Sequence, residues 1–425
     1  MTLSDSVISP PVLECMTTDD IAEALSRLKG VRPLLRRMSI SEIVDCLDRA
    51  MRLLSEEGHS PCLALLLSQL TRDRLWELLT SELRDPFILD DFQKDPVTQI
   101  RRSVRAEGVG CLTQILPGNV PDIILMSAIL ALLAKSPSLI KLSHGGAGMA
   151  WFVRFKQALE KICPVLSQAC IGILWPSHRR DLTEAALAQS DGVVVYGDEE
   201  TIHAIRPLIP AGVPALLYGH KISLGVVTSE CISKKWAELA VVDVIAYAQR
   251  GCLSPHLYYV ETGETLSALD FAVQMAEAFS ALNVPPPEIS LNEAARIQQL
   301  RGSLPLSGGV VFASKAHLSW TVLYDPDPTF QASPLGQTVW IKPVKNITDV
   351  PTYLEAVKPY LQAVGFAAPE HRQGEIARML ATTGICRICP VGTMQRPPLI
   401  WHHNGRFRLL DLLRLIDWED RPHTN

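Results

Sequence analysis

Cys252 and Asn119 are the residues whose types and positions point most directly to chemistry. Cys252 lies in residues 249–255 (QRGCLSP), after a long apolar helical pattern, and Asn119 follows a predicted strand in residues 116–121 (LPGNVP). A thiolate can attack an acyl carbon, and an amide fixed at a strand-to-helix turn can donate a hydrogen bond to the oxygen that becomes negative. The Cys252 backbone N–H would be a second donor. The pair therefore indicates thioester chemistry.

Each of the two residues also has a purely structural interpretation. Cysteine is among the most buried residue types, and Pro-Gly-Asn favours a turn by itself. A free thiol has a pKa of ~8.5, so only a small fraction is thiolate at neutral pH. Arg250 would favour the thiolate, whereas the preceding helix would oppose it, because the carboxyl end of a helix carries a partial negative charge.

The elements that must hold these residues alternate between short apolar strands and amphipathic helices. We expect strands at 110–116, 138–143, 169–175, 192–197 and 214–218, separated by helices at 121–135, 149–161, 181–188 and 199–208. Such alternation predicts a parallel sheet covered on both faces. Ligands of these sheets bind beyond the carboxyl ends of the strands, where the loops contain Asn119, Ser143 and Gly197.

Three residues at the strand ends are candidate contacts to a nucleotide. Lys141 and Ser143 end one predicted strand, and the Lys141 ammonium could bind a ribose or a phosphate, or simply be solvated. Gly197 ends another strand before a helix, where glycine permits close backbone approach to a pyrophosphate. The carboxylates at 198–200 would repel phosphates unless they turn away. No G-x-G-x-x-G fingerprint occurs.

A helical section precedes this predicted sheet and a second α/β region follows it. Residues 17–84 have helical periodicity, with a capping-box pattern from Ser39 to Glu42. Beyond residue 230 we expect helices and strands in the following order: helices at 234–249 and 267–282, strands at 257–261, 310–313, 320–324 and 339–344, and helices at 353–364 and 375–381. The expected domains are a helical N-terminal section (1–104), a nucleotide-binding α/β domain (105–230), a catalytic α/β domain (231–390) and a tail that packs back on the body (391–425).

Composition and charge narrow the class of protein. The chain has 425 residues, a net charge of −5 and 20% charged residues, which is typical of a globular protein and argues against broad electrostatic binding to nucleic acid. The ten cysteines have no framework pattern, which fits a reducing cytosol. Residues 1–11 do not resemble a signal peptide, and the longest apolar run, 123–134, is too short to span a bilayer.

Two further motifs carry no expected function. Cys386 and Cys389 form a C-x-x-C pair without a partner pair or a histidine at zinc spacing, and we interpret them as structural. His402 and His403 also lack a ligand set. We therefore expect no metal site.

At its candidate residues the chain resembles the acyl-CoA reductases of the bacterial bioluminescence type (the LuxC family), a branch of the aldehyde dehydrogenase superfamily. The resemblance covers residues from about 105 to the C-terminus, and its segments occur in the family's order. They are 116–121 (LPGNVP), 195–201 (VYGDEET), 218–223 (YGHKIS), 251–255 (GCLSP), 333–340 (SPLGQTVW) and the tail from 384 to 419.

The resemblance implies an aldehyde dehydrogenase-like α/β fold, in which a nucleotide-binding domain and a catalytic domain face each other. It implies that Cys252 is the nucleophile and Asn119 the oxyanion donor. It places Lys141 and Ser143 where the superfamily contacts the adenosine ribose or its 2′-phosphate, and Gly197 near the pyrophosphate. The implied cofactor is NADPH or NADH, and the implied assembly is a homo-oligomer.

The chain departs from the superfamily at two positions. Hydrolytic aldehyde dehydrogenases have a glutamate that activates water, and the matching position here is Leu217, which cannot act as a base. The superfamily's glutamine two positions before the cysteine is Arg250 in this chain. The loss of the glutamate suits an enzyme that must reduce its acyl-cysteine before water cleaves it.

The predicted function is therefore NAD(P)H-dependent reduction of an acyl-CoA or carrier-bound acyl thioester to an aldehyde in the cytoplasm. One alternative is an aldehyde dehydrogenase that works in the oxidising, CoA-acylating direction. Another is a non-catalytic partner subunit of an acyl-processing complex, with the helical N-terminal section as its docking surface. An acyl-transferring partner protein is compatible with each of these.

Overall fold

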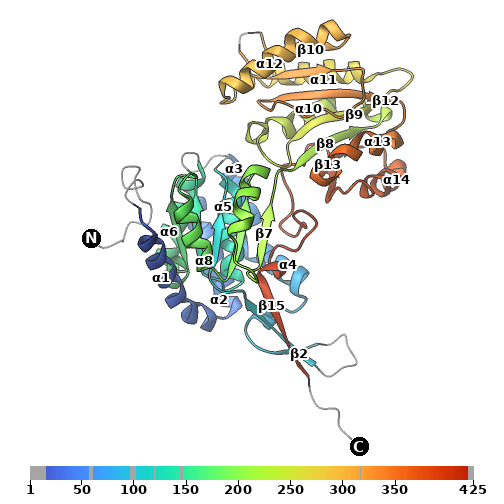
Figure 1. Cartoon of the computed structure of the whole chain (residues 1–425). Helices are drawn as coiled ribbons and strands as arrows, with labels where there is room; N and C mark the ends of the chain where they lie inside the picture. Colours follow the sequence, from blue (N-terminus) through green and yellow to red (C-terminus); the bar gives the residue numbers. More distant parts are fainter. Residues whose placement is uncertain are drawn as a thin grey trace, which may run out of the picture. The chain divides into compact units, whose positions relative to one another are not determined.

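A computed structural model describes the protein at residues 16–56, 61–95, 102–118, 121–143, 147–315 and 317–419. Its contacts divide the chain into two compact units, of which the first contains residues 1–219 and 398–425 and the second contains residues 220–397. Figure 1 shows their helices and strands. In the described ranges no helix is both long and apolar enough to cross a membrane.

The first unit is built on a five-stranded sheet in which every strand pair is parallel. The strand order is β5-β4-β3-β6-β7. The strands are β3 (Leu112–Ile115), β4 (Ser138–Leu142), β5 (Cys170–Leu174), β6 (Gly192–Tyr196) and β7 (Ala215–Tyr218). The chain starts in the middle of the sheet and winds outward to both sides, so that its topological switch point lies beside β3, as in doubly wound nucleotide-binding sheets. The predicted parallel sheet is confirmed.

Helices cover both faces of this sheet because its strands are apolar on both sides. The helices are α1 (Thr18–Arg37), α2 (Ile40–Glu56), α3 (Pro61–Gln69), α4 (Arg72–Leu83), α5 (Pro121–Leu133), α6 (Ala147–Ile162), α7 (Pro164–Gln168), α8 (Arg180–Ala188) and α9 (Glu199–Ile205). One apolar cluster joins α5 and α6 to α2, α3 and α4, and two others join the sheet to α1, α8 and α9. The predicted helical N-terminal section therefore shares a core with the sheet.

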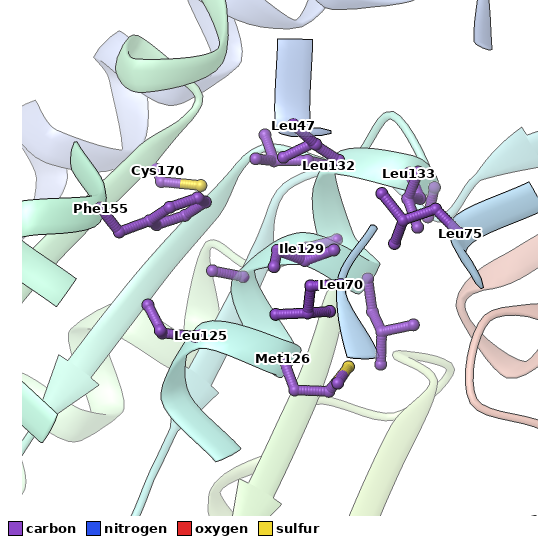
Figure 2. Packing of buried hydrophobic residues seen from close by; sticks show 14 of the residues in the cluster. Leu47, Leu70, Leu75, Leu125, Met126, Ile129, Leu132, Leu133, Phe155 and Cys170 are labelled. Atoms are coloured by element: carbon purple, nitrogen blue, oxygen red, sulfur yellow. The ribbon is translucent and has the colours of Figure 1, made fainter. Parts of the chain in front are cut away.

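The largest apolar cluster shows how the N-terminal helices are held. Leu125, Ile129 and Leu132 of α5 belong to this cluster together with Leu47 of α2 and Leu70, which precedes α4. Figure 2 shows Leu132 beside Leu47 and Ile129 beside Leu70. The predicted capping box at the start of α2 is present, since the Ser39 N–H donates to the Glu42 carboxylate at 2.7 Å and the Glu42 N–H donates to the Ser39 hydroxyl at 3.2 Å. A small antiparallel sheet of β1 (Gln93–Lys94), β2 (Arg102–Gly108) and β15 (Leu413–Glu419) completes the unit.

The second unit contains a seven-stranded sheet of order β10-β11-β12-β9-β8-β13-β14, in which only the β10–β11 pair is antiparallel. The strands are β8 (Ile222–Val227), β9 (Pro255–Glu261), β10 (Val310–Ala313), β11 (Thr321–Tyr324), β12 (Thr338–Val344), β13 (Leu361–Ala367) and β14 (Arg387–Pro390). Helices α10 (Lys234–Ile245) and α11 (Ala268–Ala281) pack on one face. The other face is covered by α13 (Val350–Leu354), α14 (Glu370–Ala381) and the segment that follows α12 (Leu291–Ser303).

Two helix predictions in this unit are wrong. Residues 353–364 were expected to form one helix, but the chain passes through a short 3₁₀ segment, Glu355–Tyr360, into strand β13. Pro359 interrupts the helix, and pairing with β8 and β14 buries the strand on both sides. The helix expected at 234–249 ends at Ile245, because Tyr247, Ala248 and Gln249 all adopt positive φ angles.

Candidate active site

Cys252 lies in a tight turn immediately before strand β9 of the second unit. The Ser254 N–H donates to the Gly251 carbonyl oxygen at 2.9 Å and closes the turn, while the Cys252 residue is half-buried. The predicted position of the cysteine in a turn is confirmed. Cys252 is therefore a partly exposed residue in a turn that is closed by a backbone hydrogen bond.

The backbone before this turn is strained and is held by a buried glutamine. Tyr247, Ala248 and Gln249 have φ angles of 52°, 50° and 64°, a region that costs non-glycine residues free energy. The Gln249 side chain is fully buried and donates to the carbonyl oxygens of Pro255 (3.0 Å) and Thr338 (2.7 Å). Its own oxygen accepts from the Thr338 N–H at 2.8 Å. Gln249 therefore fixes the turn to β9 and β12.

A hydroxyl from strand β8 holds the cysteine backbone. The Ser223 hydroxyl donates to the Cys252 carbonyl oxygen at 2.7 Å and accepts from the Ala363 N–H of β13 at 3.2 Å. Ser223 is in register with Pro255, and Ala363 is in register with Arg387 of β14. The turn that carries Cys252 thus lies at the amino-terminal end of a row of neighbouring parallel strands.

A loop after β14 packs beside the same turn and is held from two sides. The buried Asp243 carboxylate of α10 accepts the N–H groups of Gly392 (2.6 Å) and Met394 (2.9 Å). The Arg387 guanidinium donates to the carbonyl oxygens of Thr393 (3.0 Å) and Met394 (2.5 Å). Burial raises the pKa of Asp243 to about 7, against the stabilising effect of the two N–H donors.

The loop reaches the nucleophile's turn through Gln395. Its side-chain nitrogen donates to the Ser254 hydroxyl at 3.0 Å, and its side-chain oxygen lies 3.2 Å from the position that a Cβ at Gly251 would occupy. A side chain at Gly251 would therefore press on this loop. The glycine keeps the turn and the loop in close contact.

Burial dominates the electrostatics of the thiol. It raises the pKa of Cys252 to about 11, while the residue's own backbone N–H and the Arg387 guanidinium act to lower that pKa. The Arg387 guanidinium therefore acts on the sulfur, and the contribution that we expected from Arg250 stays a prediction. The Arg250 guanidinium donates to the Glu288 carbonyl oxygen at 2.7 Å and to the Glu293 carboxylate at 3.1 Å.

A buried histidine at the start of β9 provides a test of this site's electrostatics. The Nδ1 of His256 accepts the Ser333 N–H at 3.1 Å, and burial together with the nearby His220 lowers the pKa of His256 to about 4. Between pH 6.5 and 4 the unfolded chain binds a proton that the folded chain does not bind, so stability is complete above pH 6.5 and falls as the pH falls. The loss should reach about 3 kcal/mol at pH 4.

His256→Asn keeps an acceptor for the Ser333 N–H and removes the titration. Hydrogen exchange of the β9 and β12 amides in the full chain, followed from pH 7 to pH 4, measures the opening free energy. The wild type should lose stability more steeply than the variant, and comparison of the two cancels the opposite contribution of Asp243, which is common to both. Parallel profiles would contradict the role assigned to His256.

The nucleotide candidates lie in the first unit, at the carboxyl ends of neighbouring strands. Lys141 is in β4, and Ser143 follows that strand and donates to the Leu116 carbonyl oxygen after β3 at 3.1 Å. Gly197 follows β6, which is the other neighbour of β3. The structure therefore gathers Lys141, Ser143 and Gly197 at one edge of the sheet. Asn119 follows β3 in the sequence but lies outside the described residues.

Lys141 is a buried cation near the carboxyl end of β4. Its side chain is 9% exposed, burial lowers its pKa, and its ammonium lies 6.0 Å from the centre of the Trp175 ring. Among the described residues no carboxylate acts to raise the pKa of this ammonium. A buried ammonium is costly without hydrogen-bond acceptors, so this site favours hydroxyl or phosphate oxygens.

Local packing also explains why position 197 is a glycine, in addition to the predicted approach of a pyrophosphate. A Cβ at this position would lie 2.6 Å from the Thr201 side chain, so packing alone requires glycine. The Asp198 carboxylate caps helix α9 by accepting the Thr201 N–H at 2.8 Å. This negative charge occupies the start of the helix, so a pyrophosphate near Gly197 would not be bound by the end of α9.

Several residues of the site were not predicted from the sequence, namely Ser223, Asp243, Gln249, His256, Arg387 and Gln395. Asp243 had a visible signal, because it is an acid within the apolar pattern of α10. Arg387 lies within the C-x-x-C motif that we interpreted as structural. In the described part of the chain no cluster of histidine, cysteine, aspartate or glutamate has the geometry of a metal site.

Comparison with known proteins relates this geometry to a family. The sequence matches the acyl-CoA reductase (LuxC) family over residues 35–415. It is 24% identical to the long-chain acyl-protein thioester reductase 2 of Photobacterium leiognathi over 358 residues, which cover 83% of this chain and 72% of the relative. It is also 24% identical to the long-chain acyl-protein thioester reductase of Photorhabdus luminescens over 359 residues, covering 82% of this chain and 71% of the relative.

Solved structures show the fold. The NADP-dependent glyceraldehyde-3-phosphate dehydrogenase of Bacillus halodurans aligns with a TM-score of 0.71 at 15% identity, covering 95% of this chain and 92% of that chain. An aldehyde dehydrogenase of Brucella melitensis aligns with a TM-score of 0.72 at 12% identity, covering 96% and 91%. The predicted aldehyde dehydrogenase-like α/β fold is thus confirmed, and the profile match over most of the sequence shows that the chain belongs to the LuxC family of acyl-CoA reductases.

Proposed function

We propose that this chain reduces a long-chain acyl thioester, carried by CoA or by a protein, to an aldehyde through an acyl-cysteine on Cys252. The observation that carries the proposal is a half-buried cysteine in a turn fixed by Gln249 and Ser223, within a chain of the LuxC family. The curated relatives are named as long-chain acyl-protein thioester reductases, which supports the acyl class.

In the first step the Cys252 sulfur attacks the acyl carbonyl carbon. A carbon–sulfur bond to the enzyme forms, the bond to the carrier sulfur breaks, and the proton lost by Cys252 is taken up by the departing carrier thiol. The exchange is therefore neutral overall. It proceeds through the Cys252 thiolate, which a pKa of about 11 makes scarce near pH 7. The oxyanion formed on the way requires donors, and we assign this role to the Asn119 amide and the Cys252 backbone N–H.

The residues at the edge of the five-stranded sheet fit a nicotinamide nucleotide. Lys141 and Ser143 would hold the adenosine ribose, because the buried ammonium needs oxygen acceptors and the hydroxyl retains lone pairs. Gly197 would leave room for the pyrophosphate. NADPH or NADH supplies, when bound, the hydride that reduces the acyl group. We assign nucleotide binding to the first unit, which holds most of the predicted domain 105–230. We assign acyl chemistry to the second unit, which holds the predicted domain 231–390 together with Ser223 of β8 and Gln395.

Lys141→Met should weaken nucleotide binding without affecting acyl transfer. Loss of charge-assisted hydrogen bonds is expected to raise the Kd for NAD(P)H about tenfold. Nucleotide fluorescence titration measures the Kd, and the rate of Cys252 acylation serves as the internal reference. Lys161→Met, at an exposed position near the end of α6, is the matched control and should bind as the wild type does. An unchanged Kd in Lys141→Met would remove Lys141 from the nucleotide site.

Leu217 supports the reductive direction. It lies in β7 and packs in an apolar cluster, so it provides no base that could activate water against the acyl-cysteine. The alternatives remain an aldehyde dehydrogenase that forms acyl-CoA and a non-catalytic partner subunit. Rates with acyl-CoA plus NAD(P)H, compared with rates with aldehyde, CoA and NAD(P)⁺, decide the direction. Activity of the purified chain alone would exclude the partner-subunit alternative.

The proposal also covers the cellular location, the oligomeric state and the acyl donor of the chain. We assign the chain to the cytoplasm because the eight cysteines whose side chains the structure describes are free thiols. We also propose a homo-oligomer that receives acyl groups from CoA or from an acyl-transferring partner protein. Size-exclusion chromatography with light scattering tests the oligomeric state.

A further inference from the structure

Arg387 connects three parts of the second unit. It is the first residue of β14, it is half-buried, and its register partner on β13 is Ala363. The Ala363 N–H donates to the same Ser223 hydroxyl that donates to the Cys252 carbonyl oxygen. A continuous path of strand pairing and hydrogen bonds therefore runs from Arg387 across β13 and β8 to the nucleophile's turn.

A second path runs through the loop after β14. The Arg387 guanidinium donates to the carbonyl oxygens of Thr393 and Met394, which directly precede Gln395. Gln395 donates to the Ser254 hydroxyl and lies against Gly251. Displacement of this guanidinium would release the loop from the side of the turn.

Burial lowers the pKa of Arg387, while three titratable groups act to raise it, namely Cys389 on β14, Asp243 on α10 and Cys252 itself. The exposed Arg396 acts on Asp243. On β9, His256 is buried and faces His220. Of these groups, Arg387 is the one whose charge acts on the Cys252 sulfur.

We propose that Arg387 is a positioning residue for Cys252: its hydrogen bonds to the Thr393 and Met394 carbonyl oxygens fix the 393–395 loop against the nucleophile's turn, and the same guanidinium supplies positive charge near that turn. This assignment rests on the proposed function in one respect, the role of Cys252 as the nucleophile. The chemistry it assists is formation of a thiolate, which a nearby fixed cation stabilises. Arginine suits the position because its planar group bonds two carbonyl oxygens while it remains charged.

Alkylation of Cys252 by iodoacetamide tests the proposal without any acyl substrate. The rate is read for the Cys252 peptide by mass spectrometry between pH 7 and pH 10 in the full chain. Below the thiol pKa the rate follows the thiolate fraction, so Arg387→Gln should react about tenfold more slowly at each pH in this range, corresponding to one unit of pKa. Arg396→Gln is the matched control, because Arg396 is an exposed arginine of the same loop, and it should follow the wild type.

Arg387→Lys separates charge from packing. It keeps a cation but not the two-pronged hydrogen bonding, so below pH 8 it should recover most of the wild-type rate. If Arg387→Gln does not fold, Arg387→Lys still tests the proposal. A tenfold lower alkylation rate of Cys252 in the lysine variant would overturn it. Wild-type reactivity in Arg387→Gln would overturn it as well. If Cys252 is not acylated but its alkylation rates change in the variants as predicted, the proposed function is refuted. The role of Arg387 in ionisation of the thiol then still stands.

Discussion

Cys252→Ala should lose turnover of acyl-CoA with NAD(P)H by at least about 10³-fold, the scale seen when a covalent nucleophile is removed. The Cys252 sulfur is the atom that receives the acyl group, so no neighbouring residue can replace it. The change removes one sulfur from a half-buried position and should leave nucleotide binding intact. Steady-state oxidation of NAD(P)H measures turnover, and fluorescence titration measures nucleotide binding.

A matched variant is available in the same unit. Cys386 is also a half-buried free thiol, and its side chain contacts the carbonyl oxygen of Gly384. Cys386→Ser should retain turnover within about twofold, because exchange of a surface thiol for a hydroxyl alters little. Equal loss in both variants would show a general effect on folding, and substantial turnover in Cys252→Ala would refute the assignment of the nucleophile.

Asn119→Ala should slow formation of the acyl-cysteine by about 10²–10³-fold, the effect of one oxyanion donor, which is roughly 3 kcal/mol in the transition state. The donor acts on charge that exists only during acyl transfer, so the loss should fall on kcat and much less on KM. Quench-flow measurement of acyl-cysteine formation, with acyl-CoA and no reductant, isolates this step. Labelling should still reach completion at long times because Cys252 is unchanged.

Asn292→Ala is the control for this substitution, since Asn292 is exposed on α12 in the second unit. It should acylate at the wild-type rate. If Asn119→Ala also acylates at that rate, the oxyanion is stabilised by other donors and Asn119 is a turn residue.

The fold of the first unit could be predicted because local pattern and tertiary structure agree there. Short apolar runs that alternate with amphipathic helices can only be buried as a parallel sheet covered on both sides. The second unit was harder to predict. Residues 222–227 and 361–367 form central strands β8 and β13, yet neither was predicted as a strand. Their strand structure depends on pairing between segments that are distant in the sequence, and this pairing leaves little local signal.

Contacts between distant segments also limited the prediction of the candidate site. The turn at Cys252 was predictable from Gly251, one residue before it, and Pro255, three residues after it. The cation that acts on the sulfur was not, because the nearest arginine in the sequence, Arg250, pairs with Glu293 on α12. Arg387 reaches the site only through the pairing of β14 with β13 and of β13 with β8. Proximity in the sequence therefore did not point to Arg387.

Intact-mass analysis after incubation with acyl-CoAs of several chain lengths, without NAD(P)H, tests the central claim most directly. The account predicts one added acyl group per chain, located by peptide mapping on Cys252, removed by later addition of NAD(P)H with release of the aldehyde, and absent in Cys252→Ala. An adduct that persists in Cys252→Ala, or no adduct at any chain length, would contradict it.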